Sequence, residues 1–177
     1  MSTERKSFSS IGLIGLGAFG RLMASHLQPH LPLVVFDTAR PIEPDTSGCG
    51  LIPGGIAEVA ACDIVILAVP VDALAEAVAA LRPHLRSGTV VLDVGSVKIE
   101  PAQLLLAGLP DDVEIIGTHP LFGPQSARDG LKGLKIALCP TRGDSIRRIA
   151  AFLRVTLALD VILTTPDAHD QIGRAHV

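Results

Sequence analysis

Short runs of aliphatic residues alternate along the chain with segments whose apolar residues recur at helical spacing. The aliphatic runs lie at residues 11–14, 33–36, 64–69, 89–94, 113–116, 135–138 and 161–163. Helical patterns follow the first run through about Leu27 and recur at 56–62, 71–81 and 145–155. Strands that alternate with helices are typical of a parallel sheet with crossover helices on both faces. The pattern therefore predicts one doubly wound α/β domain.

Two further stretches refine this picture. Residues 64–69 form a continuous apolar run that ends at Pro70, which is typical of a central strand buried on both faces. Residues 38–55 are rich in Pro, Gly, Asp and Thr and predict an irregular surface connection.

A glycine-rich turn follows the first predicted strand and opens the first predicted helix. Its sequence, Gly15-Leu16-Gly17-Ala18-Phe19-Gly20, has the G-x-G-x-x-G spacing of dinucleotide-binding turns. Gly15 would permit the tight turn, Gly17 would let the backbone approach a pyrophosphate, and Gly20 would let the helix pack closely on the strand. The free N–H groups of the helix would face the anion. The order of strand, turn and helix indicates a Rossmann-type nucleotide site.

The second predicted strand ends in Asp37, about 20 residues beyond the first glycine, where such sites place an acidic residue. A carboxylate there would accept hydrogen bonds from the adenosine ribose and repel a 2′-phosphate, which favours NAD over NADP. Arg40 lies close enough in sequence to pair with a 2′-phosphate. NADP therefore stays an alternative.

Composition and charge restrict the class of protein. Apolar residues make up 48% of the 177 residues and charged residues 19%, which favours a well-packed globular chain. The net charge is -3, and no basic run predicts nucleic-acid binding. No signal peptide or membrane span is recognised. Cys49, Cys62 and Cys139 have no paired spacing, so we expect reduced, buried thiols, a cytoplasmic protein and no metal site.

Two polar segments follow neighbouring predicted strands, at the edge where open parallel sheets bind ligands. Residues 93–98 contain Ser96 and Lys98, and residues 117–124 contain His119. An imidazole exchanges protons near neutral pH, so His119 is the candidate for proton transfer during hydride transfer. Ser96 could hydrogen-bond the imidazole or a substrate hydroxyl. Lys98 could attract an anionic substrate or serve only to cap local structure.

Four of these motifs together resemble the prephenate/arogenate dehydrogenases of tyrosine biosynthesis. They are the glycine turn, Leu67-Ala-Val-Pro70, Asp93-Val-Gly-Ser-Val-Lys98 and Gly117-Thr-His-Pro-Leu-Phe-Gly-Pro124, of which the last is the most specific. The resemblance implies oxidative decarboxylation of prephenate or arogenate with hydride transfer to NAD(P). It implies that His119 accepts the proton of the substrate C4 hydroxyl, that Ser96 supports this contact, and that Val69 and Pro70 line the cofactor.

Members of this family continue into a helical domain that supplies the dimer interface and much of the substrate pocket. We expect residues 1–166 to form the cofactor domain and residues 167–177 to begin a truncated linker to the absent helical domain. His169 and Asp170 resemble the start of the family's linking helix. Residues 172–177 match the translation of a common sequencing adapter, so we expect them to be non-native. A homodimer is expected only for the full-length protein, and the isolated chain should expose an apolar surface.

Two alternatives keep the fold and change the function. A β-hydroxyacid-type dehydrogenase would use a lysine in its helical domain and would lack the loop at 117–124. A non-catalytic nucleotide-binding module would bind NAD without dehydrogenase activity.

Overall fold

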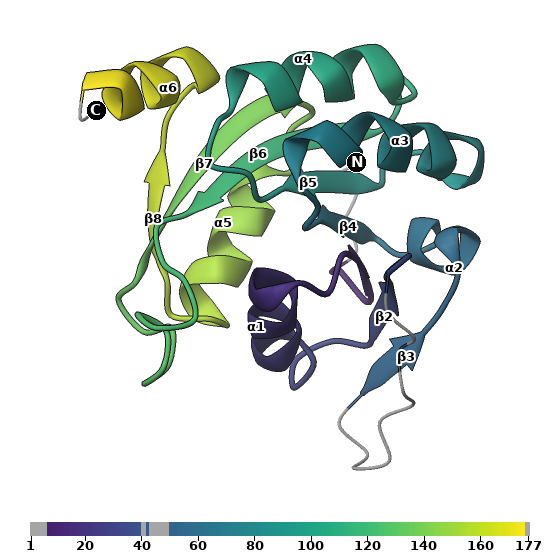
Figure 1. The fold of residues 1–177 in the computed structure, drawn as a ribbon, viewed down its shortest axis with the longest axis horizontal. Helices are drawn as coiled ribbons and strands as arrows, with labels where there is room; N and C mark the ends of the chain where they lie inside the picture. The colour runs from purple at the N-terminus through teal and green to yellow at the C-terminus, as the bar shows by residue number, and fades with distance from the viewer. Residues whose placement is uncertain (1–6, 40–41, 43–49, 176–177) are drawn as a thin grey trace, which may run out of the picture.

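The computed structural model describes residues 7–39, 42 and 50–175, which form one eight-stranded sheet with helices on both faces (Figure 1). The strands are β1 (Ile11–Ile14), β2 (Leu33–Phe36), β3 (Leu51–Pro53), β4 (Ile64–Leu67), β5 (Val90–Asp93), β6 (Glu114–Pro120), β7 (Lys135–Arg142) and β8 (Asp160–Leu163). The helices are α1 (Ala18–Leu27), α2 (Ile56–Ala60), α3 (Val71–Leu81), the 3₁₀ turn η1 (Arg82–His84), α4 (Ile99–Gly108), α5 (Ile146–Val155) and α6 (Pro166–Ala175). The prediction of a doubly wound α/β fold is confirmed.

The strand order is β3-β2-β1-β4-β5-β6-β7-β8. The first six strands are parallel and follow the usual Rossmann order. β7 runs antiparallel to β6, and β8 pairs parallel with β7. The sheet is therefore mostly parallel, and the predicted parallel arrangement does not extend to β7 and β8, which run opposite to the other six strands. Residues 121–134 form turns and no crossover helix, and without such a helix the chain reverses direction beside β6.

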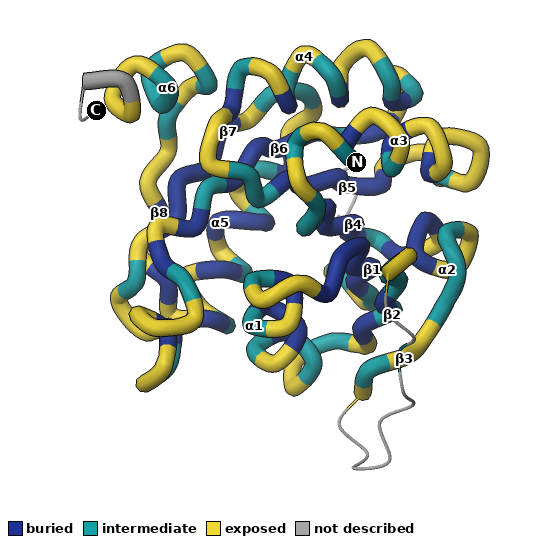
Figure 2. Tube along the Cα trace, in the orientation of Figure 1, coloured by how far each residue is buried: buried dark blue, intermediate teal, exposed yellow. Residues whose placement is uncertain are grey.

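Two hydrophobic cores lie on the two faces of the sheet, and the strands in the middle contribute to both. In β4, Ile64 and Ile66 pack in the core beneath α1 and α5, whereas Val65 and Leu67 pack in the core beneath α2, α3 and α4. Figure 2 shows the central strands in the colour of buried residues and the outer surfaces of α3 and α4 as exposed. β4 is thus buried on both faces, as the continuous apolar run predicts, but it ends at Leu67, and residues 68 and 69 of the predicted strand are half-buried and lie outside it.

Five elements differ markedly from the sequence prediction. β3 lies within the stretch expected to be irregular, and α4 has no counterpart among the predicted helices. β6 and β7 each extend four residues farther along the chain, to Pro120 and Arg142, and α6 continues to Ala175. α4 is hard to recognise because Pro101 stands in its first turn and its leucines are consecutive, which weakens the helical period. No helix in the described part of the chain is long and apolar enough to cross a membrane.

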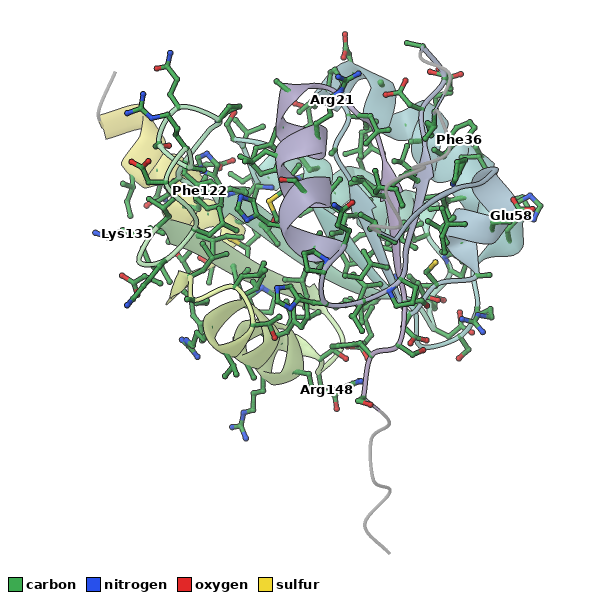
Figure 3. All side chains as sticks on the ribbon, turned by 90° about the horizontal axis from the view of Figure 1, so that it is seen from below. Arg21, Phe36, Glu58, Phe122, Lys135 and Arg148 are labelled. Carbon is green, nitrogen blue, oxygen red and sulfur yellow. The ribbon has the colours of Figure 1, made fainter. Side chains whose placement is uncertain are left out.

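The start of the described chain is held against α5. The guanidinium carbon of Arg148 lies 3.9 Å from the ring centroid of Phe8, and Figure 3 labels Arg148 beside the chain that enters β1. Cys62 and Cys139 are buried and free, as expected. Cys49 and Arg40 lie outside the described residues.

Candidate functional site: a nucleotide cleft and a histidine corner

The glycine turn, residues 15–20, connects β1 to α1 with a geometry that only glycine fits at two positions. Gly15 has φ +99, and a Cβ there would lie 2.2 Å from the carbonyl oxygen of Ala68. A Cβ on Gly20 would lie 2.0 Å from the carbonyl oxygen of Gly15. Both contacts are far shorter than van der Waals distance, so the turn and the close packing of α1 require these glycines.

Gly17 differs from its neighbours. It is exposed at the N-cap of α1, and a Cβ there would meet no atom of the described chain within 4 Å. Packing therefore does not require a glycine at this position. The absence of a side chain instead lets a ligand approach the backbone at the start of the helix, where the N–H groups are free to bind an anion.

Asp37 follows β2 and reaches back to the glycine turn. Its Oδ2 accepts a hydrogen bond from the N–H of Leu16 at 2.6 Å, and its Oδ1 accepts one from Ala39 at 2.7 Å. The two bonds hold the carboxylate at the end of β2, beside the turn. The spacing in the sequence predicts this juxtaposition, and the structure contains it.

A cleft of about 400 Å³ opens beside the turn. Five of the predicted cofactor residues line it, namely Gly15, Gly17, Asp37, Val69 and Pro70. It is also lined by residues that the sequence analysis did not select: Phe36, Ile56, Ala73, Glu76, Ala77 and Ala80. The small side chains at helical spacing on α3 were the available signal, because a row of alanines leaves room beside a helix.

The other predicted cofactor residues lie at the start of α1. Ala18 is exposed in the first turn. The ring centroid of Phe19 lies 6.2 Å from that of Phe122, in the loop after β6. Phe122 and Phe36 lie on opposite sides of α1 (Figure 3). The pairing of the Phe19 and Phe122 rings therefore places the glycine turn beside the loop that follows His119.

Lys98 lies where it cannot meet a substrate from solvent. Its side chain has 0% exposure, and Nζ forms an ion pair with Asp93 and donates a hydrogen bond to the carbonyl oxygen of Thr118 at 2.7 Å. Burial raises the pKa of Asp93, although the ion pair with Lys98 acts in the opposite direction. Of the two roles considered for Lys98, attracting an anionic substrate and holding local structure, this geometry favours the second.

His119 lies within β6 rather than in the loop after it, where the sequence analysis placed it. It pairs with Ala137 of β7 and is half-buried. Alternate residues of a strand share a face, so His119 lies on the side of Gly117, whose Cβ position faces Lys98 and Asp93. Burial lowers the pKa of His119, with further lowering from His169 and Lys98 and an opposing effect of Asp170. The neutral form of the imidazole is therefore favoured over a wider pH range than in an ordinary histidine.

α6 brings two further polar residues to His119. The Nδ1 of His119 lies 2.8 Å from Nε2 of His169, and Nδ1 of His169 lies 2.8 Å from Oδ1 of Asp170. Asp170 also accepts hydrogen bonds from the N–H groups of Lys98 and Ile99 at the start of α4. We call His119, His169 and Asp170 the histidine corner. The sequence predicts His169 and Asp170 only as part of a linking helix, because nothing in the sequence relates residue 169 to residue 119.

Ser96 is exposed on the loop between β5 and α4. The register pairs Asp93 with Gly117, so this loop and the end of β6 leave the same edge of the sheet. Ser96 and His119 thus share an edge, as the sequence predicts.

Residues 48–164 match the family described as the nucleotide-binding domain of prephenate dehydrogenase. The chain belongs to this family. The resemblance to this family is thereby confirmed. The match includes β4, β5, β6 and the residues Ser96 and His119, whereas the glycine turn at residues 15–20 lies before the matched residues.

Individual relatives agree with the family. A probable arogenate/prephenate dehydrogenase of Methanocaldococcus jannaschii is 31% identical over 114 residues, which are 62% of this chain and 25% of that protein. A cyclohexadienyl dehydrogenase of Zymomonas mobilis is 31% identical over 129 residues, 67% of this chain and 43% of that protein. The chain therefore spans less than half the length of both curated relatives.

The fold is shared with a crystal structure of prephenate dehydrogenase from A. aeolicus in complex with hydroxyphenyl propionate and NAD+. The TM-score is 0.74 at 22% identity, and the match covers 96% of this chain and 64% of that one. This prephenate dehydrogenase nucleotide-binding domain thus has the fold of a solved family member along almost its entire length.

Proposed function

We propose that this chain is the cofactor-binding part of an enzyme that oxidatively decarboxylates prephenate or arogenate. The observation that carries the proposal is the juxtaposition of a cleft beside the glycine turn with a half-buried histidine, whose pKa is lowered by burial, at the same edge of the sheet. The family match supports the same conclusion. The loop at residues 117–124 favours this substrate class over the β-hydroxyacid class.

The cleft is suited to NAD. Gly17 allows a pyrophosphate to approach the N-terminus of α1, and Asp37 presents a carboxylate to the adenosine ribose hydroxyls. Val69 and Pro70 line the side of the cleft that leads to β4. When bound, the nicotinamide supplies the hydride acceptor. Because a carboxylate repels a 2′-phosphate, NAD is favoured over NADP.

The residues of this chain need to orient the substrate and hold one proton. In the proposed reaction, Nε2 of His119 accepts the proton of the C4 hydroxyl while the hydride leaves C4. The bond from the ring to its carboxylate breaks, carbon dioxide leaves, and the electron pair enters the ring, which becomes aromatic. His119 then returns the proton to the phenolic oxygen of the product. Ser96 supports the hydroxyl contact from the neighbouring loop.

Exposed apolar residues on β8, beside α6, support contact with a further domain in the full-length protein. Ile162 and Leu163 on β8 are 41% and 57% exposed, respectively. We infer that the family's helical domain covers this edge in the full-length protein and carries the homodimer interface. The two buried free thiols are compatible with a cytoplasmic location.

The test has two parts. Calorimetric titration of this chain should detect NAD binding. The affinity for NAD should be lower in the Asp37→Ala variant, and the affinity of the unaltered chain for NADP should be lower than that for NAD. Clear preference for NADP would overturn the cofactor assignment. A full-length enzyme containing this domain should reduce NAD with prephenate or arogenate. NAD binding without turnover on either substrate would instead support a non-catalytic module.

A further inference from the structure

The histidine corner contains two hydrogen bonds in series, and the end of the series is fixed. Asp170 is a carboxylate, because hydrogen bonds from His169 and from the N–H groups of Ile99 and Lys98 hold its pKa below the ordinary value despite the opposing effect of burial. A carboxylate only accepts hydrogen bonds. Nδ1 of His169, 2.8 Å from Oδ1, must therefore carry a proton.

The protonation state then follows along the series. A neutral imidazole has one donor nitrogen and one acceptor nitrogen. With Nδ1 of His169 as the donor, its Nε2 is the acceptor, and Nδ1 of His119, at 2.8 Å, must be the donor. The same rule leaves Nε2 of His119 with the lone pair, which is the atom that a base needs. Each step depends on a contact within the described chain.

We propose that His169 and Asp170 are positioning residues that hold His119 as the Nδ1–H tautomer with Nε2 as the proton acceptor. The role of the tautomer in catalysis rests on the proposed function, whereas the tautomer itself does not. An isolated imidazole favours the opposite tautomer, with the proton on Nε2, so the protein must impose this one. α6 thereby completes a site whose other parts come from β6 and the start of α4.

The corner also accommodates the charge that appears during the reaction. When His119 takes the hydroxyl proton it becomes positive, and the titratable groups that face it are Lys98, His169 and Asp170. Lys98 is already paired with Asp93. The carboxylate of Asp170, reached through the donor Nδ1 of His169, is therefore the group that stabilises the imidazolium. After the proton returns to the product oxygen, the corner is restored without gain or loss of a proton.

Asp170 also caps the start of α4, which connects the histidine corner to the rest of the fold. Its oxygens accept hydrogen bonds from Lys98 at 2.8 and 3.1 Å and from Ile99 at 2.9 Å, which satisfies free N–H groups at the start of α4. Figure 1 shows α6 beside α4 at this end of the sheet. Removing the whole side chain would disturb both tasks, so the test needs a variant that retains the cap.

Asp170→Asn is that variant. Its amide oxygen can take the place of Oδ2, which accepts from Ile99 at 2.9 Å and from Lys98 at 3.1 Å. Its NH₂ group then takes the place of Oδ1 and loses only the 2.8 Å bond that Oδ1 accepts from Lys98. There it would donate to Nδ1 of His169. The protons would shift along the series, and Nε2 of His119 would become a donor that cannot accept the substrate proton. His169→Gln is the matched control variant, which should keep His119 in the Nδ1–H tautomer, because its amide oxygen can still accept a hydrogen bond from Nδ1 of His119.

The primary measurement is the tautomer itself, from two-bond proton–nitrogen NMR spectra of the full chain labelled with ¹⁵N-histidine. We expect His119 and His169 to carry their protons on Nδ1, whereas His26, His30 and His84 serve as internal references with the ordinary Nε2–H form. Asp170→Asn should convert both corner histidines to Nε2–H, His169→Gln should leave His119 as Nδ1–H, and His84→Gln should change nothing. An Nε2–H proton on His119 in the unaltered chain would overturn the proposal.

Turnover in a full-length enzyme that contains this domain provides the second measurement. Asp170→Asn should lower kcat by about 10²-fold or more, because the base is lost. His169→Gln should cost only about tenfold, the scale of one altered hydrogen bond. The KM for NAD should stay the same in both. Equal losses in the two variants would contradict the proposal.

The two proposals fail in different ways. If the tautomers are as expected but the full-length enzyme forms no NADH from either substrate, the proposed function is wrong and the positioning of His119 stands. If NADH forms but His119 carries its proton on Nε2, the positioning role is wrong and the proposed function stands. Thermal unfolding of each variant, followed by circular dichroism, identifies one that has merely lost its fold.

Discussion

The glycine turn and the histidine corner lie at the same edge of the sheet but are built in opposite ways. The glycine turn is a continuous segment whose function depends on its backbone, with a single distant carboxylate from Asp37 beside it. The histidine corner joins β6, the start of α4 and α6 through side chains that lie far apart in the sequence. A backbone site can be recognised from spacing, because the glycines and the turn are neighbours. A side-chain site of this kind exists only after the sheet has formed.

The largest expected effect concerns His119. In a full-length enzyme that contains this domain, His119→Ala should lower kcat by about 10²–10⁴-fold, because the proton acceptor is removed. The dissociation constant of NAD, measured by titration, should not change, since His119 does not line the nucleotide cleft. The variant would thus distinguish the role of the histidine corner in turnover from the role of the glycine turn in NAD binding. Unchanged turnover would exclude His119 from the reaction.

Substitution of Lys98 tests how much the buried ion pair beside the histidine corner stabilises the chain. Lys98→Met should destabilise the chain by about 3–5 kcal/mol in urea unfolding, because it leaves the buried carboxylate of Asp93 without its partner. The exposed Lys132→Met is the control and should have little effect. If Asp93→Leu is added to Lys98→Met, much of the lost stability should return. A loss below about 1 kcal/mol for the single variant would contradict this role.

Within the glycine turn, two substitutions should separate packing from binding. Gly20→Ala should cost about 1–3 kcal/mol of stability, since its Cβ would overlap the carbonyl oxygen of Gly15. Gly17→Ala should leave the free energy of unfolding nearly unchanged but weaken NAD binding, because its Cβ would project where the ligand approaches. Chemical unfolding and calorimetry measure the two effects. If Gly17→Ala bound NAD normally, the assignment of the cleft would be wrong.

The smallest effect is a shift in pH dependence. Because burial lowers the pKa of His119, its neutral form persists to more acidic pH than that of an ordinary histidine. Activity of the full-length enzyme should be present above the pKa of His119 and be lost as the pH falls through it. The acidic limb of the kcat/KM profile should therefore lie below about 6.5, the value of an unperturbed histidine. A limb above 6.5 would contradict the burial argument.

Most of the fold could be predicted from the sequence. β1, β2 and α3 lie at the predicted residues, because each depends on a local period or on a proline or glycine at its end. β3 was missed because it is short and lies in a segment rich in turn-forming residues. The direction of β7 was missed because an aliphatic run has the same pattern in a parallel and an antiparallel pair.

The candidate site could be predicted only in part. The glycine turn, Asp37 and His119 follow from spacing and residue type. The burial of Lys98 does not, since a lysine in a polar loop gives no sign that its ammonium group turns toward Asp93. The partners of His119 could not be found either, because the sequence separation of 50 residues between His119 and His169 carries no periodic signal.

The sequence by itself determined most strands of the sheet, the nucleotide turn and the family, since these depend on patterns and motifs within short segments. Only the tertiary structure decided which nitrogen of His119 is free to act as a base. That choice depends on the carboxylate of Asp170, two hydrogen bonds away, and on α6 packing against the start of α4. Hydrogen bonds transmit a protonation state through space, and their partners are set by the fold rather than by distance along the chain.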